Sequence, residues 1–233
     1  MKIMKFKMFS VIVGTECCIA SCPFCVSGVK PNQENLKERE TKIIIDIPKK
    51  DIVEEREIIE KMDVTQGKIV IGIDLTLENV NQKYNAIVYN AILGGTANSK
   101  MFQEVREKAS LAYSAGSTYL RYKGNIFIKC GIEIKNYEKA LEIIRKQLED
   151  MKKGIFTDED IENAKKSIIS GIRSIDDEQD TEITYFFGQE ITNEKISTEE
   201  YIKNINQVSK EDIIKIANSL QINTIYFLKN KEE

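Results

Sequence analysis

The chain has 233 residues and contains no histidine, and this absence excludes several kinds of active site. Catalytic zinc in peptidases is normally held by two or three imidazole groups, as in the H-x-x-E-H and H-E-x-x-H motifs. Nucleophile systems that pair serine or cysteine with a histidine base are excluded for the same reason. If this chain takes part in peptide hydrolysis, the metal and the general base come from another chain.

The chain also has only three prolines, little net charge and no long apolar run. A net charge of −3 with mixed signs gives no electrostatic basis for binding nucleic acid. The apolar part of Met1–Val13 is too short, and too soon followed by Glu16, for a secretory signal, and no segment has the length of a membrane span. We therefore expect a cytoplasmic protein with one sizeable domain, or one domain plus an appendage.

Four of the five cysteines lie in the first 25 residues, and three of them have a recognisable spacing. Cys18, Cys22 and Cys25 form a C-x3-C-x2-C triplet after an apolar, strand-like run. This triplet resembles the cluster-binding loop of radical S-adenosylmethionine enzymes, in which three thiolates hold a [4Fe–4S] cluster and the fourth iron takes S-adenosylmethionine. Clustered thiols can also form adventitious zinc or disulfide contacts, so that alternative stays open.

The context of the triplet differs from that of such enzymes, because their α/β barrels need about 200 residues or more. Here a different pattern begins within about 40 residues, after a change in composition at 30–35. We therefore expect residues 1–36 to be a truncated or fused fragment and residues 37–233 to form the main domain. In that domain, Cys130 lies in a strand-like pattern and is predicted to be a small buried side chain.

Strands and helices alternate irregularly along the main domain. Alternating apolar residues predict strands at Thr41–Ile47, Lys68–Leu77, Tyr113–Tyr119, Asn125–Ile134 and Ile222–Leu228, whereas the charge-rich segment Asp51–Lys61 is predicted to be a helix. This order predicts an α+β fold with a mostly antiparallel sheet and helices packed on one face. Five aromatic residues are assigned to its core: Tyr119, Phe127, Phe186, Phe187 and Phe227.

Several helix starts carry capping residues. Thr157 with Asp160 has the form of a capping box, and Ser197 and Ser209 each precede an acid by three residues. A helix after Asn136 has an apolar stripe at helical spacing, formed by Tyr137, Ala140, Leu141, Ile144, Leu148 and Met151. Two further helical segments are predicted, one after Asn79 and one at Thr181–Ile191.

The stretch Leu93–Tyr113, LGGTANSKMFQEVREKASLAY, is the most informative part of the chain. Gly94 and Gly95 follow a periodic apolar segment, so we expect them to end a helix with at least one positive φ angle. No Gly-Lys-Ser/Thr follows, which excludes a phosphate-binding P-loop. A second helix then carries Arg106, and Tyr113 lies at the start of a strand.

This stretch resembles the core motif of the second, C-terminal half of the pitrilysin/insulinase zinc peptidases. The residues that match it are Gly94, Gly95, Ser99, Phe102, Arg106, Leu111, Ala112 and Tyr113, and Asp63–Lys68 is similar to the entry strand of the same half. The resemblance covers roughly residues 50 to 233. It implies an antiparallel sheet covered by helices, and a partner half that holds the zinc and a glutamate base.

The resemblance also implies roles for Arg106 and Tyr113, which match an arginine–tyrosine pair that orients the substrate and hydrogen-bonds the carbonyl oxygen as the tetrahedral intermediate forms. A plainer alternative gives Arg106 a surface salt bridge to Glu104 or Asp150, worth roughly 0–1 kcal/mol. No residue of this chain is expected to be catalytic by itself, and no cofactor is expected in the main domain.

Three hypotheses follow from the sequence. The first is the substrate-cradling half of an insulinase-like zinc peptidase, inactive alone, with a peptide substrate and with a zinc-bearing half or another dimer partner. The second is a scaffold subunit of the same fold without a catalytic role. The third is an iron–sulfur radical protein, or a fragment of one, that uses Cys18, Cys22 and Cys25.

Overall fold

The structure is a computed structural model, and it describes residues 54–77, 79, 81–121, 123–192 and 196–232. All of these belong to one compact unit, Ile47–Glu233. The predicted strand at Thr41–Ile47, the cysteine triplet and the boundary at residue 36 lie outside the described residues.

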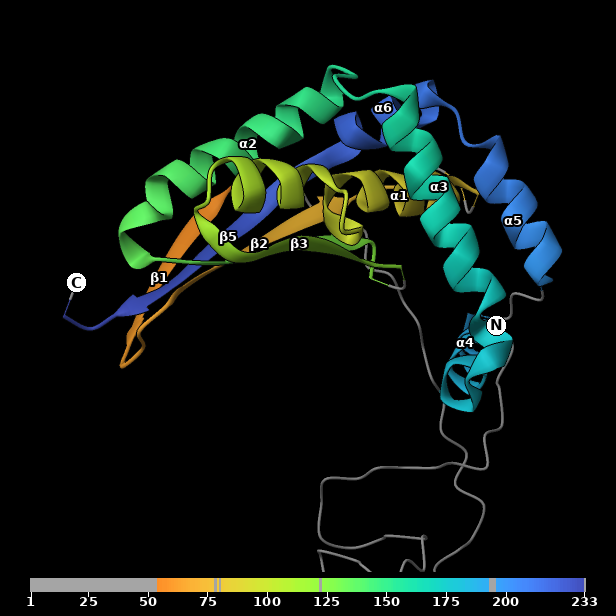
Figure 1. Ribbon diagram of the computed structural model, residues 1–233, viewed down its shortest axis with the longest axis horizontal. Helices are drawn as coiled ribbons and strands as arrows, with labels where there is room; N and C mark the ends of the chain where they lie inside the picture. Colours follow the sequence, from red (N-terminus) through yellow and green to blue (C-terminus); the bar gives the residue numbers. More distant parts are fainter. Residues whose placement is uncertain (1–53, 78, 80, 122, 193–195, 233) are drawn as a thin grey trace, which may run out of the picture. The chain divides into compact units, whose positions relative to one another are not determined.

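The described residues form a five-stranded sheet with the strand order β1-β5-β2-β4-β3 (Figure 1). Its strands are β1 Arg56–Met62, β2 Gly67–Leu75, β3 Ala112–Leu120, β4 Asn125–Ile132 and β5 Leu220–Asn230. The pairs β5–β2, β2–β4 and β4–β3 are antiparallel, and β1 pairs with β5 in parallel. The predicted mostly antiparallel sheet is confirmed.

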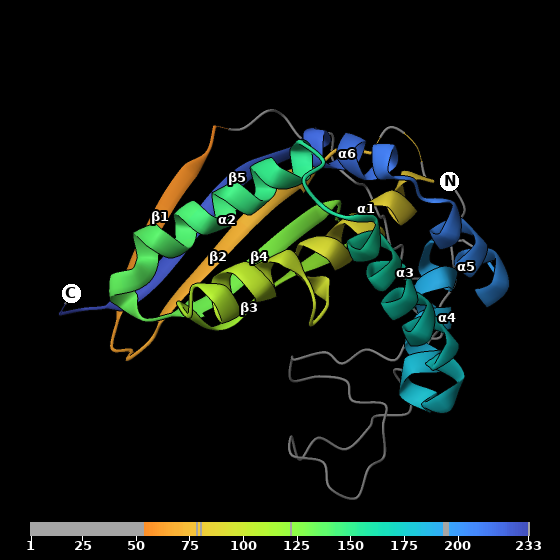
Figure 2. The ribbon, with the colours of Figure 1, turned by 45° about the horizontal axis from the view of Figure 1, so that its top comes forward.

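Helices cover one face of this sheet. Figures 1 and 2 show α1 (Gln82–Asn90), α2 (Tyr137–Lys152) and α6 (Lys210–Ser219) on the same side of the strands. Burial along β2 alternates with a period of two, as a sheet with one covered face requires: Ile69, Ile71 and Ile73 are buried, and the residues between them are more exposed. The α+β class predicted from the sequence is therefore confirmed.

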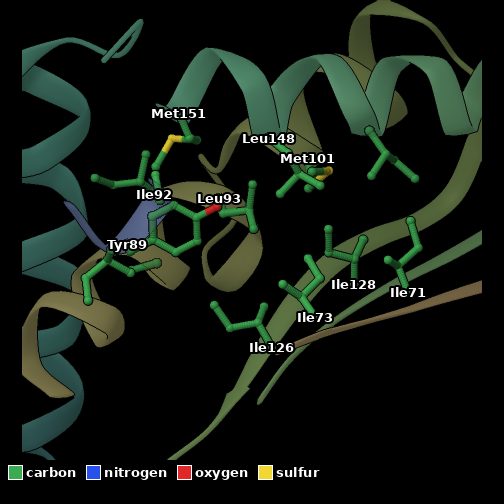
Figure 3. Close-up of a cluster of buried hydrophobic side chains, with 14 of the residues drawn as sticks. Ile71, Ile73, Tyr89, Ile92, Leu93, Met101, Ile126, Ile128, Leu148 and Met151 are labelled. Carbon is green, nitrogen blue, oxygen red and sulfur yellow. The ribbon is translucent and has the colours of Figure 1, made fainter. Parts of the chain in front are cut away.

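The core lies between the sheet and its helices (Figure 3). Ile71 and Ile73 of β2 and Ile126 and Ile128 of β4 point toward side chains from the helical layer. The helical side of the cluster is formed by Tyr89, Ile92, Leu93, Met101, Leu148 and Met151. The apolar stripe predicted on α2 is buried at every one of its positions.

The capping predictions are also confirmed at the helices that follow α2. Capping boxes at Thr157 and Ser209 begin α3 (Asp158–Arg173) and α6, and the Ser197 side chain accepts a hydrogen bond from the Glu200 N–H at the start of α5 (Thr198–Gln207). Gly154 ends the α2 region with a φ of 71°, and Gly124 occupies the β3–β4 turn with a φ of 59°. Both angles favour glycine.

The helix predicted at Asp51–Lys61 is wrong, because Arg56–Met62 is the edge strand β1. Its alternating charges have good helix propensity, but its backbone pairs with β5, from Arg56 opposite Thr224 to Met62 opposite Asn230. Tyr137 and Tyr226 donate hydrogen bonds to Glu57 and Glu60 of this strand. Long-range pairing of this kind overrides the local propensity of an exposed segment.

The assignment of five aromatic residues to the core is partly wrong. Phe227 is buried and stacks on Tyr137 with ring centroids 4.0 Å apart. Tyr119 and Phe127 are half-buried. Phe186 and Phe187, on α4 (Gln179–Thr192), are each 52% exposed.

Candidate functional site

The Gly94–Gly95 turn lies against β3, the strand that carries Tyr113. The helix ends directly after these glycines, as predicted: a π-helical turn, Ala91–Gly95, continues α1, and the next residue, Thr96, is extended. Neither glycine has a positive φ, so the predicted left-handed angle is wrong. Glycine is required here for a different physical reason: two backbone segments approach each other closely.

That close approach is visible in the space around Gly94. A Cβ atom placed on Gly94 would lie 2.4 Å from the Ser117 nitrogen and 2.8 Å from the Gly116 carbonyl carbon, and one placed on Gly116 would lie 3.0 Å from the Gly94 oxygen. Beside this contact, the Ser117 hydroxyl donates a hydrogen bond of 2.8 Å to the Asn90 side-chain oxygen. Two facing glycines therefore set the distance between the helix end and β3.

Arg106 lies on a second π-helical segment, Phe102–Lys108, whose Val105 is buried and whose outer positions are exposed. The Arg106 guanidinium lies over the Phe102 ring, 4.6 Å from its centroid. The plainer alternative, a salt bridge from Arg106 to Glu104 or Asp150, is not observed: Glu104 pairs with Lys108 at 2.7 Å, and Arg106 makes no ion pair with any described residue. Stacking on an aromatic ring orients the guanidinium while its N–H groups stay accessible. π-Helical turns are rare and occur frequently at functional sites.

A tight cap joins this segment to β3. The Leu111 N–H donates to the Val105 carbonyl oxygen at 3.1 Å, and the Ser110 hydroxyl donates to the Glu107 carbonyl oxygen at 3.3 Å. Ser110 itself has a φ of 53°, the left-handed conformation that commonly ends a helix. Leu111 is buried after this cap, so the direction of entry into β3 is set by packing as well as by the turn.

Tyr113 occupies an irregular point of the β3–β4 pairing. Ala112 pairs with Ile132 and Ser114 with Gly131, so β3 advances by two residues where β4 advances by one, and Tyr113 is the extra residue of a β-bulge. Such bulges re-aim side chains and are common beside active sites. The Tyr113 side chain is 63% exposed.

A cavity of about 560 Å³ lies beside Tyr113. Besides Tyr113, it is lined by residues from the β1–β2 turn and from the segment after β4: Thr65, Gln66, Glu133, Ile134 and Lys135. Lys135 and Glu133 form an ion pair of 2.9 Å, so the rim has charges of both signs. Thr65 and Gln66 belong to the segment Asp63–Lys68, which the resemblance includes, whereas Glu133, Ile134 and Lys135 belong to no sequence motif. The two segments are distant in sequence and meet only through the sheet register.

Arg106 and Tyr113 thus lie on consecutive elements, both with exposed side chains. No hydrogen bond joins them within the described part of the chain, and Arg106 does not line the cavity beside Tyr113. Chemically, the two groups offer a phenolic donor and a cation stacked on an aromatic ring, both exposed at the surface.

Metal binding has no support in the part of the chain that the structure describes. No group of three or more Cys, Asp or Glu side chains there could hold a metal ion, and Cys18, Cys22 and Cys25 lie outside it. Cys130 is buried as predicted, and burial raises the pKa of its thiol to about 12. A thiol of that kind is a poor nucleophile and a poor metal ligand. None of the described helices is both long enough and apolar enough to cross a membrane.

Comparisons with known proteins agree on one family. Residues 27–168 match the family described as "Peptidase M16 inactive domain". The "Probable inactive metalloprotease YmfF" of Bacillus subtilis is 39% identical over 181 residues, which are 77% of this chain and 42% of that protein. The chain therefore spans less than half the length of this relative.

Two solved structures are similar to most of the chain. A conserved protein from Enterococcus faecalis V583 is 26% identical with a TM-score of 0.72, over 89% of this chain and 48% of that one. The peptidase M16 inactive domain from Pseudomonas fluorescens has a TM-score of 0.66 at 15% identity, over 83% of this chain and 48% of that one. The second likeness concerns the fold alone.

Proposed function

The chain belongs to the peptidase M16 inactive-domain family, and from this premise we propose that it is the substrate-holding half of a zinc peptidase. In this proposal, a partner half supplies the zinc and the glutamate base, and this chain closes the other side of a peptide-cleaving chamber. The absence of histidine from the sequence agrees with that division of labour.

The observation that carries the proposal is the placement of Tyr113. An exposed phenol at a β-bulge, beside a cavity of about 560 Å³, can reach a bound peptide without a change in the fold. Its hydroxyl would donate a hydrogen bond to the scissile carbonyl oxygen as negative charge develops there. Arg106, held over Phe102, would orient the peptide and add positive charge near the same oxygen. Both groups stabilise the transition state more in a water-poor chamber than in bulk water.

The test is a reconstituted pair of this chain with the zinc-bearing half. We expect Arg106→Ala to lower peptide turnover by a factor of about 10². Tyr113→Phe, which keeps the ring and removes the hydroxyl, should cause a smaller loss with unchanged stability. Matched controls are Lys108→Ala on the same helix and Tyr226→Phe on β5, and both should keep full turnover. This chain alone should cleave no peptide.

Equal turnover by both site variants and the unmodified pair would refute the proposal and leave the scaffold role. That alternative has support in the word "inactive" in the names of the family and of the B. subtilis relative. A cytoplasmic location for the pair remains a prediction from the sequence.

The iron–sulfur alternative rests on the spacing of Cys18, Cys22 and Cys25 alone. The matched family residues begin at position 27, after the triplet. A brown protein with broad absorbance near ~400 nm after anaerobic reconstitution would support it, since thiolate-to-iron charge transfer produces such colour.

A further inference from the structure

Helix α4 carries an apolar stripe that is open to solvent. Ile183 is 65% exposed and Phe186 and Phe187 are each 52% exposed, at spacings of three and four residues that put all three on one face of the helix. Large apolar side chains gathered on one surface commonly mark a site of interaction with another protein. Isolated exposed apolar residues elsewhere would need no such explanation.

The opposite face of α4 holds the helix in place. Tyr185 and Gln189 are half-buried there, and the Gln189 side chain makes two hydrogen bonds of 3.0 Å with the backbone of Ile196. The short helix Ile175–Asp177 is the described element with which α4 makes its main contact. In Figures 1 and 2, α4 lies away from the sheet, near the end of α3. The exposed stripe is therefore the outer face of an anchored helix.

The sequence segment that carries this stripe has charges of one sign. Between Arg173 and Lys195 the sequence has seven acidic residues and no lysine or arginine. Two of the acids, Asp180 and Glu190, are exposed on the same face as the stripe. Two copies of such an acidic face repel each other, so self-association through it is disfavoured. Binding to any other negatively charged partner is disfavoured for the same reason. A surface with lysine and arginine around an apolar hollow is complementary to it.

We propose that the outer face of α4 is the docking surface for the zinc-bearing partner half, which presents an apolar hollow bordered by lysine and arginine. This inference rests on the proposed function and adds the place of contact. The B. subtilis relative and the E. faecalis protein each contain at least as much chain again, since 42% and 48% of their lengths are covered. If this chain binds a partner half of similar size, it needs an apolar contact area, and the stripe on α4 provides one.

The experiment uses the full chain and, as the candidate partner, a histidine-bearing M16 half cloned from the same genome, with binding measured by calorimetry. We expect the double variant Ile183→Ser/Phe186→Ser to weaken binding at least ~10-fold. Ile155→Ser is the matched control, because Ile155 is 55% exposed but lies outside α4, and it should bind normally. Asp180→Lys/Glu190→Lys should weaken binding and reduce its salt dependence, whereas Glu107→Lys should change neither.

Each other outcome overturns a defined statement. If the unmodified chain binds and the α4 variants bind equally well, the docking surface is wrong and the proposed function stands. If the unmodified chain does not bind the zinc half, both fail. If the double variant lowers the melting temperature of the chain alone far more than Ile155→Ser does, the stripe is covered by this chain itself. If the chain alone forms a dimer that the double variant dissociates, the occupant is a second copy.

Discussion

The contact between Gly94 and β3 makes a sharp prediction about stability. A Cβ at position 94 would lie 2.4 Å from a backbone nitrogen and 2.8 Å from a backbone carbon of β3, and real Cβ contacts essentially never come below 3.0 Å. The clashing atoms belong to the paired strand rather than to a flexible side chain, so they cannot move without disturbing the β3–β4 pairing. Gly94→Ala should therefore be strongly destabilising.

The expected loss can be bounded from general experience with crowded sites. Inserting one methyl group into a well-packed site costs about 1–3 kcal/mol, and occasionally more, when the backbone has to shift. We expect a loss of about 3 kcal/mol at Gly94, because the added Cβ would clash with backbone atoms, which cannot move as easily as a side chain. For a domain of about this size, 1 kcal/mol corresponds to about 2–4 °C, so the melting temperature should fall by roughly 6–12 °C.

Two further glycines supply internal controls, measured in the same urea unfolding series followed by circular dichroism. Gly171, an exposed position on α3, would have nothing within 4 Å of an added Cβ, so Gly171→Ala should raise stability by about 0.5–1 kcal/mol. Gly95→Ala should cost less than Gly94→Ala, because its nearest neighbour is the Asn90 side-chain nitrogen at 2.9 Å. A Gly94→Ala variant as stable as the unmodified chain would show that the two backbones do not constrain this position.

Two other predictions concern local chemistry. Burial raises the pKa of the Cys130 thiol to about 12, so the unfolded chain releases this proton before the folded chain does, and the free energy of unfolding should fall as pH rises from about 9 toward 12. In Cys130→Ala, the free energy of unfolding should fall less steeply with pH, by up to about 1.4 kcal/mol per pH unit. Urea titrations at several pH values would measure this difference. Thr157→Ala should lower stability by about 1 kcal/mol through loss of the α3 capping box, whereas Thr157→Ser should retain it, as thermal unfolding would show.

Features with local causes were predictable from the sequence. The caps of α3, α5 and α6 depend on a hydroxyl and the backbone N–H three residues later, so a few neighbouring residues are enough to identify them. The stripe of α2 and the alternation of β2 likewise depend on periodicity within one element.

Features with distant causes were not predictable. β1 is a strand because its backbone pairs with β5, where Arg56 lies opposite Thr224, while its own side chains favour a helix. The exposure of Phe186 and Phe187 also has no local signal, since an aromatic residue on a helix is usually buried. The two π-helical segments have no composition that distinguishes them from ordinary helix.

The glycine pair shows why a correct motif can still carry a wrong explanation. Gly94 and Gly95 do end the helical path, but glycine is needed there because β3, which begins only at Ala112, passes within contact distance. The same contact fixes the strand whose first residues include the Tyr113 bulge, and the next helix delivers Arg106. Tyr113 therefore lies on a strand whose position is set in part by a backbone approach at Gly94, which does not touch Tyr113 itself. A substitution at Gly94 should disturb the proposed site without removing any of its chemical groups.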